Sequence, residues 1–310
     1  MLPSRVTVCE VGPRDGLQNE PVSLPVEAKV RLIEALAETG LQRIEIGSFV
    51  RSDWIPQLAD TGEVAGRIVR RPGVRYSALV PNRTGLERAV AAGMREVAVF
   101  MSATESHNLK NTNKSVAESL AQFEEIVPLA KKQGLFVRAY LSTVFGCPYE
   151  GKVDPDRSLE IARQLHVIGC DELSLGDTIG VGNPRQTREI VQLFLRDFAP
   201  GWLSLHLHDT HGTALANCLA ALELGIAHFD ASIGGMGGCP YAPGAAGNLA
   251  TEDLVSMLTD MGIATGIDLD KLIAAGELAQ QMAGRRLPGR RLQAALGRRN
   301  PGEARRAAAT

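Results

Sequence analysis

The chain has 310 residues, of which 45% are hydrophobic and 22% charged, with a formal net charge of −2 at pH 7. This composition is typical of a soluble globular protein, and the absence of a basic excess argues against nucleic acid as the main partner. No run approaches the roughly 18 apolar residues of a membrane-spanning helix, and no signal-peptide core opens the chain, so we expect no membrane partner. The odd number of cysteines, five, favours reduced thiols and a cytoplasmic location.

Short β-branched runs alternate with amphipathic segments along most of the chain. Eight runs are predicted to be strands, at residues 6–9, 41–46, 75–80, 94–100, 135–141, 170–175, 203–208 and 226–231. Five of them follow a glycine that is expected to end a helix: Gly40, Gly93, Gly134, Gly169 and Gly225. Residues 26–38 and 115–132, which lie between such runs, place apolar side chains at helical spacing.

Alternating strands and helices indicate a parallel sheet. Eight such units in about 260 residues predict an α/β fold of the closed (β/α)₈ TIM barrel type. An open doubly wound sheet is the alternative, but no glycine fingerprint for a dinucleotide follows the first strand.

The end of the chain differs from the rest in composition. Two further helices, at 251–261 and 269–283, are expected to complete a catalytic barrel domain over residues 1–285. Residues 286–310 form a basic segment rich in arginine and alanine, which we expect to be loosely ordered and solvated.

His206 and His208 stand at alternate positions of the seventh predicted strand, and so project to the same face. Functional residues of such barrels lie at the carboxyl ends of strands, where Asp15 and Asn248 follow the first and the eighth strand. A carboxylate, two imidazoles and an amide oxygen suit Mg²⁺ or Mn²⁺. Alternatively, the histidines are independent residues of a polar strand end, Asp15 caps a helix and Asn248 occupies a turn.

Two further residues, which follow the first and the eighth predicted strand, are candidates for a catalytic role. Arg14 adjoins Asp15, where its guanidinium could hold a carboxylate or a developing oxyanion; the alternative is a structural ion pair with Glu10 or Glu45. Cys239 lies in a glycine-rich loop that is able to close over a site, or else is a small buried residue. The other cysteine in a Cys-Pro-Tyr sequence, Cys147, is expected to be structural because no such loop surrounds it.

Five segments together resemble the hydroxymethylglutaryl-CoA lyase family of metal-dependent barrel enzymes. They are EVGPRDGLQNE at 10–20, GCPYEG at 146–151, SLGDTIGVG at 174–182, HLHDTHG at 206–212 and GGCPYAPGAAGNLATEDL at 237–254. The resemblance implies divalent-metal ligands at Asp15, His206, His208 and Asn248. It further implies that Arg14 polarises the thioester carbonyl, that Glu45 is the second-strand acid near the metal, and that Cys239 is the cysteine of the mobile catalytic loop.

The implied reaction is a retro-Claisen cleavage of 3-hydroxy-3-methylglutaryl-CoA to acetyl-CoA and acetoacetate. His206, Asp15 and Cys239 are the candidates for acid and base, and their roles stay open. The chain has His211 where the family often has tyrosine, and residues 102–111 differ from the animal enzyme. Because residues 102–111 are expected to contact substrate rather than metal, this difference bears on the acyl group and not on the reaction type.

The alternatives are a lyase for a related 3-hydroxyacyl-CoA, such as citramalyl-CoA or a longer branched 3-hydroxyglutaryl-CoA, a synthase of the isopropylmalate or homocitrate type, and a silent binding scaffold. With the lyase activity we expect an acyl-CoA substrate, a homodimer, and a place in leucine degradation and ketone-body formation.

Overall fold

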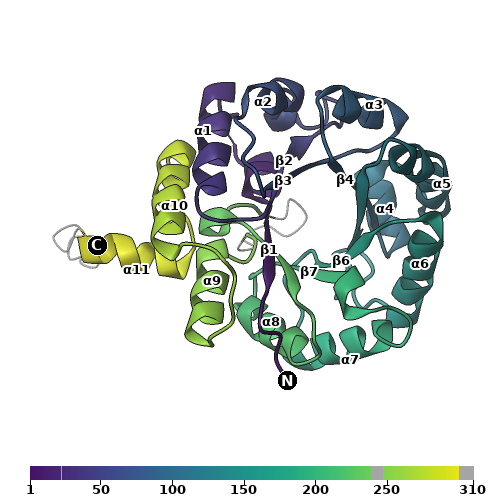
Figure 1. The fold of residues 1–310 in the computed structure, drawn as a ribbon. Helices are drawn as coiled ribbons and strands as arrows, with labels where there is room; N and C mark the ends of the chain where they lie inside the picture. Colours follow the sequence, from purple (N-terminus) through teal and green to yellow (C-terminus); the bar gives the residue numbers. More distant parts are fainter. Residues whose placement is uncertain (22, 239–246, 300–310) are drawn as a thin grey trace.

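The computed structural model describes residues 1–21, 23–238 and 247–299. In this part of the chain eight parallel strands close into a barrel, in the order of the sequence (Figure 1). The strands are β1 (Thr7–Glu10), β2 (Arg43–Ser48), β3 (Arg75–Leu79), β4 (Glu96–Ser102), β5 (Phe136–Ser142), β6 (Glu172–Asp177), β7 (Leu203–Leu207) and β8 (His228–Ala231). The predicted TIM barrel is confirmed, and the open doubly wound sheet is excluded because β1 pairs with β8.

Helices surround the ring of strands in Figure 1. They are α1 (Val26–Ala37), α2 (Thr61–Arg67), α3 (Arg83–Ala91), α4 (Glu105–Thr112), α5 (Val116–Lys132), α6 (Pro155–Ile168), α7 (Pro184–Phe194), α8 (Ala214–Leu222), α9 (Thr251–Asp260), α10 (Leu269–Ala283) and α11 (Arg290–Arg299). Short turns of other helix types are η1 (Gly12–Gly16), η2 (Pro56–Leu58), η3 (Pro200–Trp202) and η4 (Ile233–Gly235). Within the described residues, no helix combines the length and apolar character needed to cross a membrane.

Glycines lie in the connections between helices and the following strands, at the positions where the sequence predicted helix ends. Positive φ angles occur at all five glycines that were expected to end helices: Gly40, Gly93, Gly134, Gly169 and Gly225. Gly40 also permits close packing, because a Cβ atom there would lie 2.2 Å from the carbonyl oxygen of Gly266. Each such stop returns the chain to the amino-terminal end of the next strand.

Apolar side chains fill the layer between strands and helices, whereas buried ions occupy the amino-terminal end of the barrel interior. Arg43 pairs with Glu172 at 2.6 Å and with Glu96, and Arg138 pairs with Glu172 at 2.7 Å and with Asp230 at 2.6 Å. All five side chains are at most 3% exposed. Buried ions need such partners because the desolvation of an unpaired charge is costly.

The carboxyl-terminal segment is more ordered than expected. Residues 290–299 form α11, whose Leu292 is buried, and Gln293 donates to Gln280 of α10 over 2.6 Å. Asp253 accepts hydrogen bonds from the backbone of Arg290 and Arg291. The expectation of a loosely ordered segment from residue 286 is therefore wrong for α11, and residues 300–310 lie outside the described part.

Candidate functional site

The chain turns sharply after β1 and so brings Arg14 and Asp15 to the carboxyl end of the barrel. The backbone N–H groups of Arg14, Asp15 and Gly16 all donate to the carbonyl oxygen of Val11. The bond from Gly16 spans five residues, the spacing of a π-helix, and residues 12–16 form the π-helical turn η1. Glu10 holds this turn against η4, because its carboxylate accepts from the backbone of Gly12 and Ile233 at 2.7 and 2.9 Å. Asp15 lies within η1 and contacts other side chains, so it is not a helix cap.

His206 of β7 and His208, the residue directly after β7, share one face, as their alternate positions predict. Their Nε2 atoms lie 3.3 Å apart. The Oδ2 atom of Asp15 lies 3.7 Å from Nε2 of His206 and 3.9 Å from Nε2 of His208. Octahedral Mg²⁺ with bonds of about 2.1 Å separates neighbouring ligands by about 3 Å, so a small movement of these atoms would let them share one ion.

The charges of this group also suit a cation. Burial alone would raise the pKa of Asp15, but Arg14 and the two histidines lower it to about 2. Burial and the proximity of His206 lower the pKa of His208 to about 4. At neutral pH the site therefore offers an ionised carboxylate and a neutral imidazole, the forms that bind metals.

Asn248 joins this group through an isolated bridge to His208. Its Nδ2 atom donates to Oδ2 of Asp15 at 2.7 Å and to the carbonyl oxygen of Met236 at 3.0 Å. In this arrangement the amide nitrogen, and not the oxygen, faces Asp15. Asn248 thus lies at the predicted place, while its role as an oxygen ligand stays a prediction.

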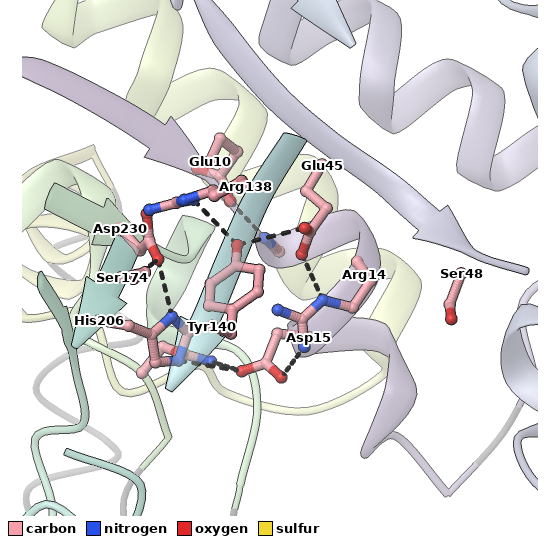
Figure 2. Close-up of polar contacts among 12 residues, drawn as sticks. Glu10, Arg14, Asp15, Glu45, Ser48, Arg138, Tyr140, Ser174, His206 and Asp230 are labelled. Atoms are coloured by element: carbon pink, nitrogen blue, oxygen red, sulfur yellow. Dashed lines mark hydrogen bonds and ion pairs between the residues drawn. The ribbon is translucent and has the colours of Figure 1, made fainter. Parts of the chain in front are cut away.

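Arg14 connects the carboxylate of Glu45 in β2 with that of Asp15 in η1. It donates from Nε to Glu45 at the interior of β2 and from Nη1 to Asp15 at 2.5 Å. Its guanidinium carbon lies 5.3 Å from the ring centre of Tyr140, whose hydroxyl donates to Glu45 over 3.2 Å. The ion pair with Glu45 that the sequence left as an alternative is present, and it orients Arg14 toward the histidine side of the barrel (Figure 2).

A cavity opens above this group. Arg14, Asp15, His206 and His208 line it together with side chains from the surrounding loops. His107 and Asn111 of α4 also line the cavity, so the 102–111 segment contacts the space that a substrate would enter. Trp54, Asn82, Lys114 and Gln122 also line this cavity.

Sequence reasoning missed several residues of the site. Asp230 of β8 lies 3.1 Å from Nδ1 of His206, and Arg138 and Tyr140 of β5 extend this polar group (Figure 2). Burial would raise the pKa of Asp230, but Arg138 and His206 lower it. In the sequence, these residues could have been noticed only because a charged residue, Arg138 or Asp230, stands inside an otherwise largely apolar strand, β5 or β8.

The structure tests the prediction for only one of the two cysteines in Cys-Pro-Tyr sequences. Cys147 is buried and Thr104 donates to its sulfur over 3.2 Å, which agrees with a structural role. Cys239 lies outside the described residues, so its predicted catalytic role is untested.

The HMGL-like family model matches residues 5–279 of this chain. The chain belongs to the HMGL-like family. The resemblance drawn from the sequence motifs is thereby confirmed.

A hydroxymethylglutaryl-CoA lyase of Bacillus subtilis (strain 168) is 52% identical over 291 residues, which cover 94% of this chain and 97% of that protein. The cytoplasmic 3-hydroxy-3-methylglutaryl-CoA lyase of Rattus norvegicus is 50% identical over 276 residues, covering 89% and 80% of the two chains.

Solved structures of the same kind share the fold. The Bacillus subtilis HMG-CoA lyase matches with a TM-score of 0.93 at 52% identity, covering 94% of this chain and 98% of that one. An HMG-CoA lyase from Acinetobacter baumannii, in complex with coenzyme A and 3-methylmalate, matches with a TM-score of 0.89 at 42% identity, covering 93% and 94%.

Proposed function

We propose that this HMGL-like chain is a carbon–carbon lyase that cleaves 3-hydroxy-3-methylglutaryl-CoA to acetyl-CoA and acetoacetate. The observation that carries the proposal is the convergence of Asp15, His206 and His208 beside Arg14 at the base of one cavity. Lyases of this activity from Bacillus subtilis and Rattus norvegicus, about half identical over most of this chain, support it.

We assign a divalent-metal site, for Mg²⁺ or Mn²⁺, to Asp15, His206, His208 and Asn248. The donor set fits, because a carboxylate with a low pKa and two imidazole nitrogens face one point. When bound there, such an ion would lower the pKa of the substrate's tertiary hydroxyl and polarise a neighbouring carbonyl oxygen.

In the proposed retro-Claisen step, a base removes the proton of the tertiary hydroxyl. As the hydroxyl oxygen forms the ketone of acetoacetate, the bond between its carbon and the methylene of the acetyl unit breaks. The electron pair passes to the thioester, giving the enolate of acetyl-CoA, whose methylene carbon then accepts a proton. Asp15, His206 and Cys239 are the candidates for these proton transfers.

Arg14 is the residue placed to hold the enolate oxygen. Its Nε and Nη1 groups are engaged by Glu45 and Asp15, which fixes the plane of the guanidinium before substrate binds. A donor that is oriented in advance stabilises developing negative charge without reorganisation during the reaction. Glu45 acts in this proposal by orienting Arg14.

An acyl-CoA is the substrate class that we propose for the cavity above the site. The HMG-CoA lyase from Acinetobacter baumannii was solved with coenzyme A, which supports this class. We further propose that the enzyme acts in the cytoplasm as a homodimer, in leucine degradation and ketone-body formation. Light scattering on the purified protein tests the dimer, and a monomer at assay concentration would contradict it.

The acyl group is tested by a substrate panel. Purified enzyme should show a higher kcat/KM for 3-hydroxy-3-methylglutaryl-CoA than for citramalyl-CoA or a longer branched 3-hydroxyglutaryl-CoA. A higher value for citramalyl-CoA would overturn the substrate assignment and leave the reaction type standing.

A further inference from the structure

Asp230 lies behind His206, on the side away from Asp15 (Figure 2). The two residues stand opposite each other on neighbouring strands, because His206 of β7 is paired in register with Asp230 of β8. Oδ2 of Asp230 lies 3.1 Å from Nδ1 of His206, and both side chains are buried. The strand register itself therefore sets this contact.

The partners of Asp230 identify it as a carboxylate. Arg138 donates from Nη2 to Oδ1 over 2.6 Å, and Ser174 donates from its hydroxyl to Oδ2 over 3.0 Å. Arginine stays protonated in proteins, and the buried charge of Arg138 faces both Asp230 and Glu172, which favours the ionised form of Asp230. An ionised carboxylate can only accept hydrogen bonds.

The proton on His206 follows from this arrangement. Because Asp230 accepts, the Nδ1 atom of His206 must be the donor. In the neutral ring, Nε2 then carries the lone pair, and Nε2 is the atom that faces His208 and Asp15. The lone pair is thus directed to the point where the three candidate ligands meet.

His208 provides the contrast. Its Nδ1 atom is buried and has no hydrogen-bond partner among the described residues. The ring of His206 is therefore held at Nδ1 by Asp230, whereas the ring of His208 has no such contact at Nδ1 among the described residues.

We propose that Asp230 is a positioning residue, which holds His206 in the tautomer and orientation that present Nε2 to the metal site, while Arg138 holds Asp230 in place. Its effect on metal affinity rests on the proposed function, whereas the tautomer does not. The competing explanation is that Asp230 serves only to neutralise Arg138.

The tautomer is measured directly by NMR on metal-free enzyme labelled with ¹⁵N-histidine, at a pH where His206 is neutral. The His206 signals are assigned by their loss in His206→Gln. Nδ1 should show the shift of a protonated nitrogen and Nε2 that of an unprotonated one. The opposite pattern overturns the proposal, and since this measurement uses the wild-type protein it does not depend on whether a variant folds.

The variant Asp230→Asn tests whether the tautomer of His206 affects metal affinity. The amide oxygen of Asn can accept from Arg138, which turns its NH₂ group toward Nδ1 of His206 and moves the ring proton to Nε2. Mn²⁺ affinity, measured by the EPR signal of the free ion, should fall about 10- to 100-fold, the range for loss of a residue that orients a metal ligand. Unchanged affinity in folded Asp230→Asn enzyme would overturn the proposal.

Ser204→Ala is the matched control. Ser204 accepts a hydrogen bond from the same Nη2 atom of Arg138, whereas the hydrogen-bond partner of Nδ1 of His206 is Asp230. The variant should keep the His206 tautomer and the Mn²⁺ affinity; an equal loss of affinity in both variants would assign the effect to Arg138 and refute the positioning role. If wild-type enzyme bound no Mn²⁺, the proposed metal site would fail, while the NMR result would still decide the tautomer.

Discussion

Asn248 donates a hydrogen bond from Nδ2 to Oδ2 of Asp15 over 2.7 Å. The two residues are 233 positions apart in sequence and meet because β1 and β8 are neighbours in the closed barrel. Asn248 also forms a bridge with His208, so this one residue links the first, seventh and last units at the rim. Barrel closure is thus what assembles the candidate metal site.

Loss of one imidazole should weaken metal binding. His208→Ala removes one of the three converging ligand atoms, and we expect Mn²⁺ affinity to fall at least ~10-fold. His211→Ala is a control that removes a nearby exposed imidazole outside this cluster. EPR titration of both variants checks the prediction, and equal affinities in His208→Ala and wild type would remove His208 from the site.

Arg14→Lys should impair the chemical step more than substrate binding. A lysine ammonium cannot reproduce the planar guanidinium that contacts Glu45 and Asp15 together. We expect kcat to fall by ~10²-fold or more, the scale for loss of an oxyanion partner, with a smaller change in KM. Steady-state kinetics decides: a raised KM with unchanged kcat would mean that Arg14 only binds substrate.

The buried Glu252 at the start of α9 predicts a pH effect on stability. Its Oε2 accepts from the backbone of Gly234 at 3.0 Å, whereas Oε1 has no partner among the described residues. Burial raises the pKa of Glu252 to about 8. Because the folded pKa lies above the usual value, the protonated group stabilises the fold fully at pH below about 4.5, and this contribution is lost as the pH rises through 8.

Glu252→Gln replaces the acid with a neutral group that still accepts from Gly234. Between pH 5 and pH 9 the wild type should lose stability relative to this variant, by on the order of 2–5 kcal/mol, since each pKa unit corresponds to about 1.4 kcal/mol. Urea unfolding at several pH values measures the difference. Parallel stability curves for the two proteins would show that Glu252 does not titrate as its burial requires.

The proposed role of Cys239 can be tested independently of its placement. Cys239→Ser replaces a thiol with a far weaker acid, so kcat should fall by ~10²–10⁴-fold, the usual contribution of a positioned proton donor. Metal affinity should stay unchanged. Alkylation should inactivate the wild type, and bound substrate should protect it. Full activity of Cys239→Ser would return this residue to a structural role.

The sequence contained the information for the barrel and for much of its rim. Glycine stops and β-branched runs are local signals, and residues that follow successive strands of a parallel barrel must lie at one end of it. For that reason Asp15, His206 and Asn248 could be brought together without knowledge of which strands touch in register.

The remaining contacts depend on features that no local pattern encodes. The pair His206 and Asp230 arises from the register between two strands, and Arg138 reaches Asp230 across the barrel interior. Helix α11 was missed for a related reason, since its arginine-rich sequence suggests a solvated segment while the buried Leu292 anchors it to α10. In both cases tertiary packing determines the outcome.

The central claim is tested most directly by acetoacetate formation from 3-hydroxy-3-methylglutaryl-CoA. Purified enzyme is stripped with EDTA, assayed, and assayed again after addition of Mg²⁺ or Mn²⁺. We predict no significant turnover in the stripped enzyme, and restored turnover with one acetyl-CoA released per acetoacetate once the metal is added. Full activity in EDTA would contradict the metal site, and no acetoacetate under either condition would contradict the proposed function.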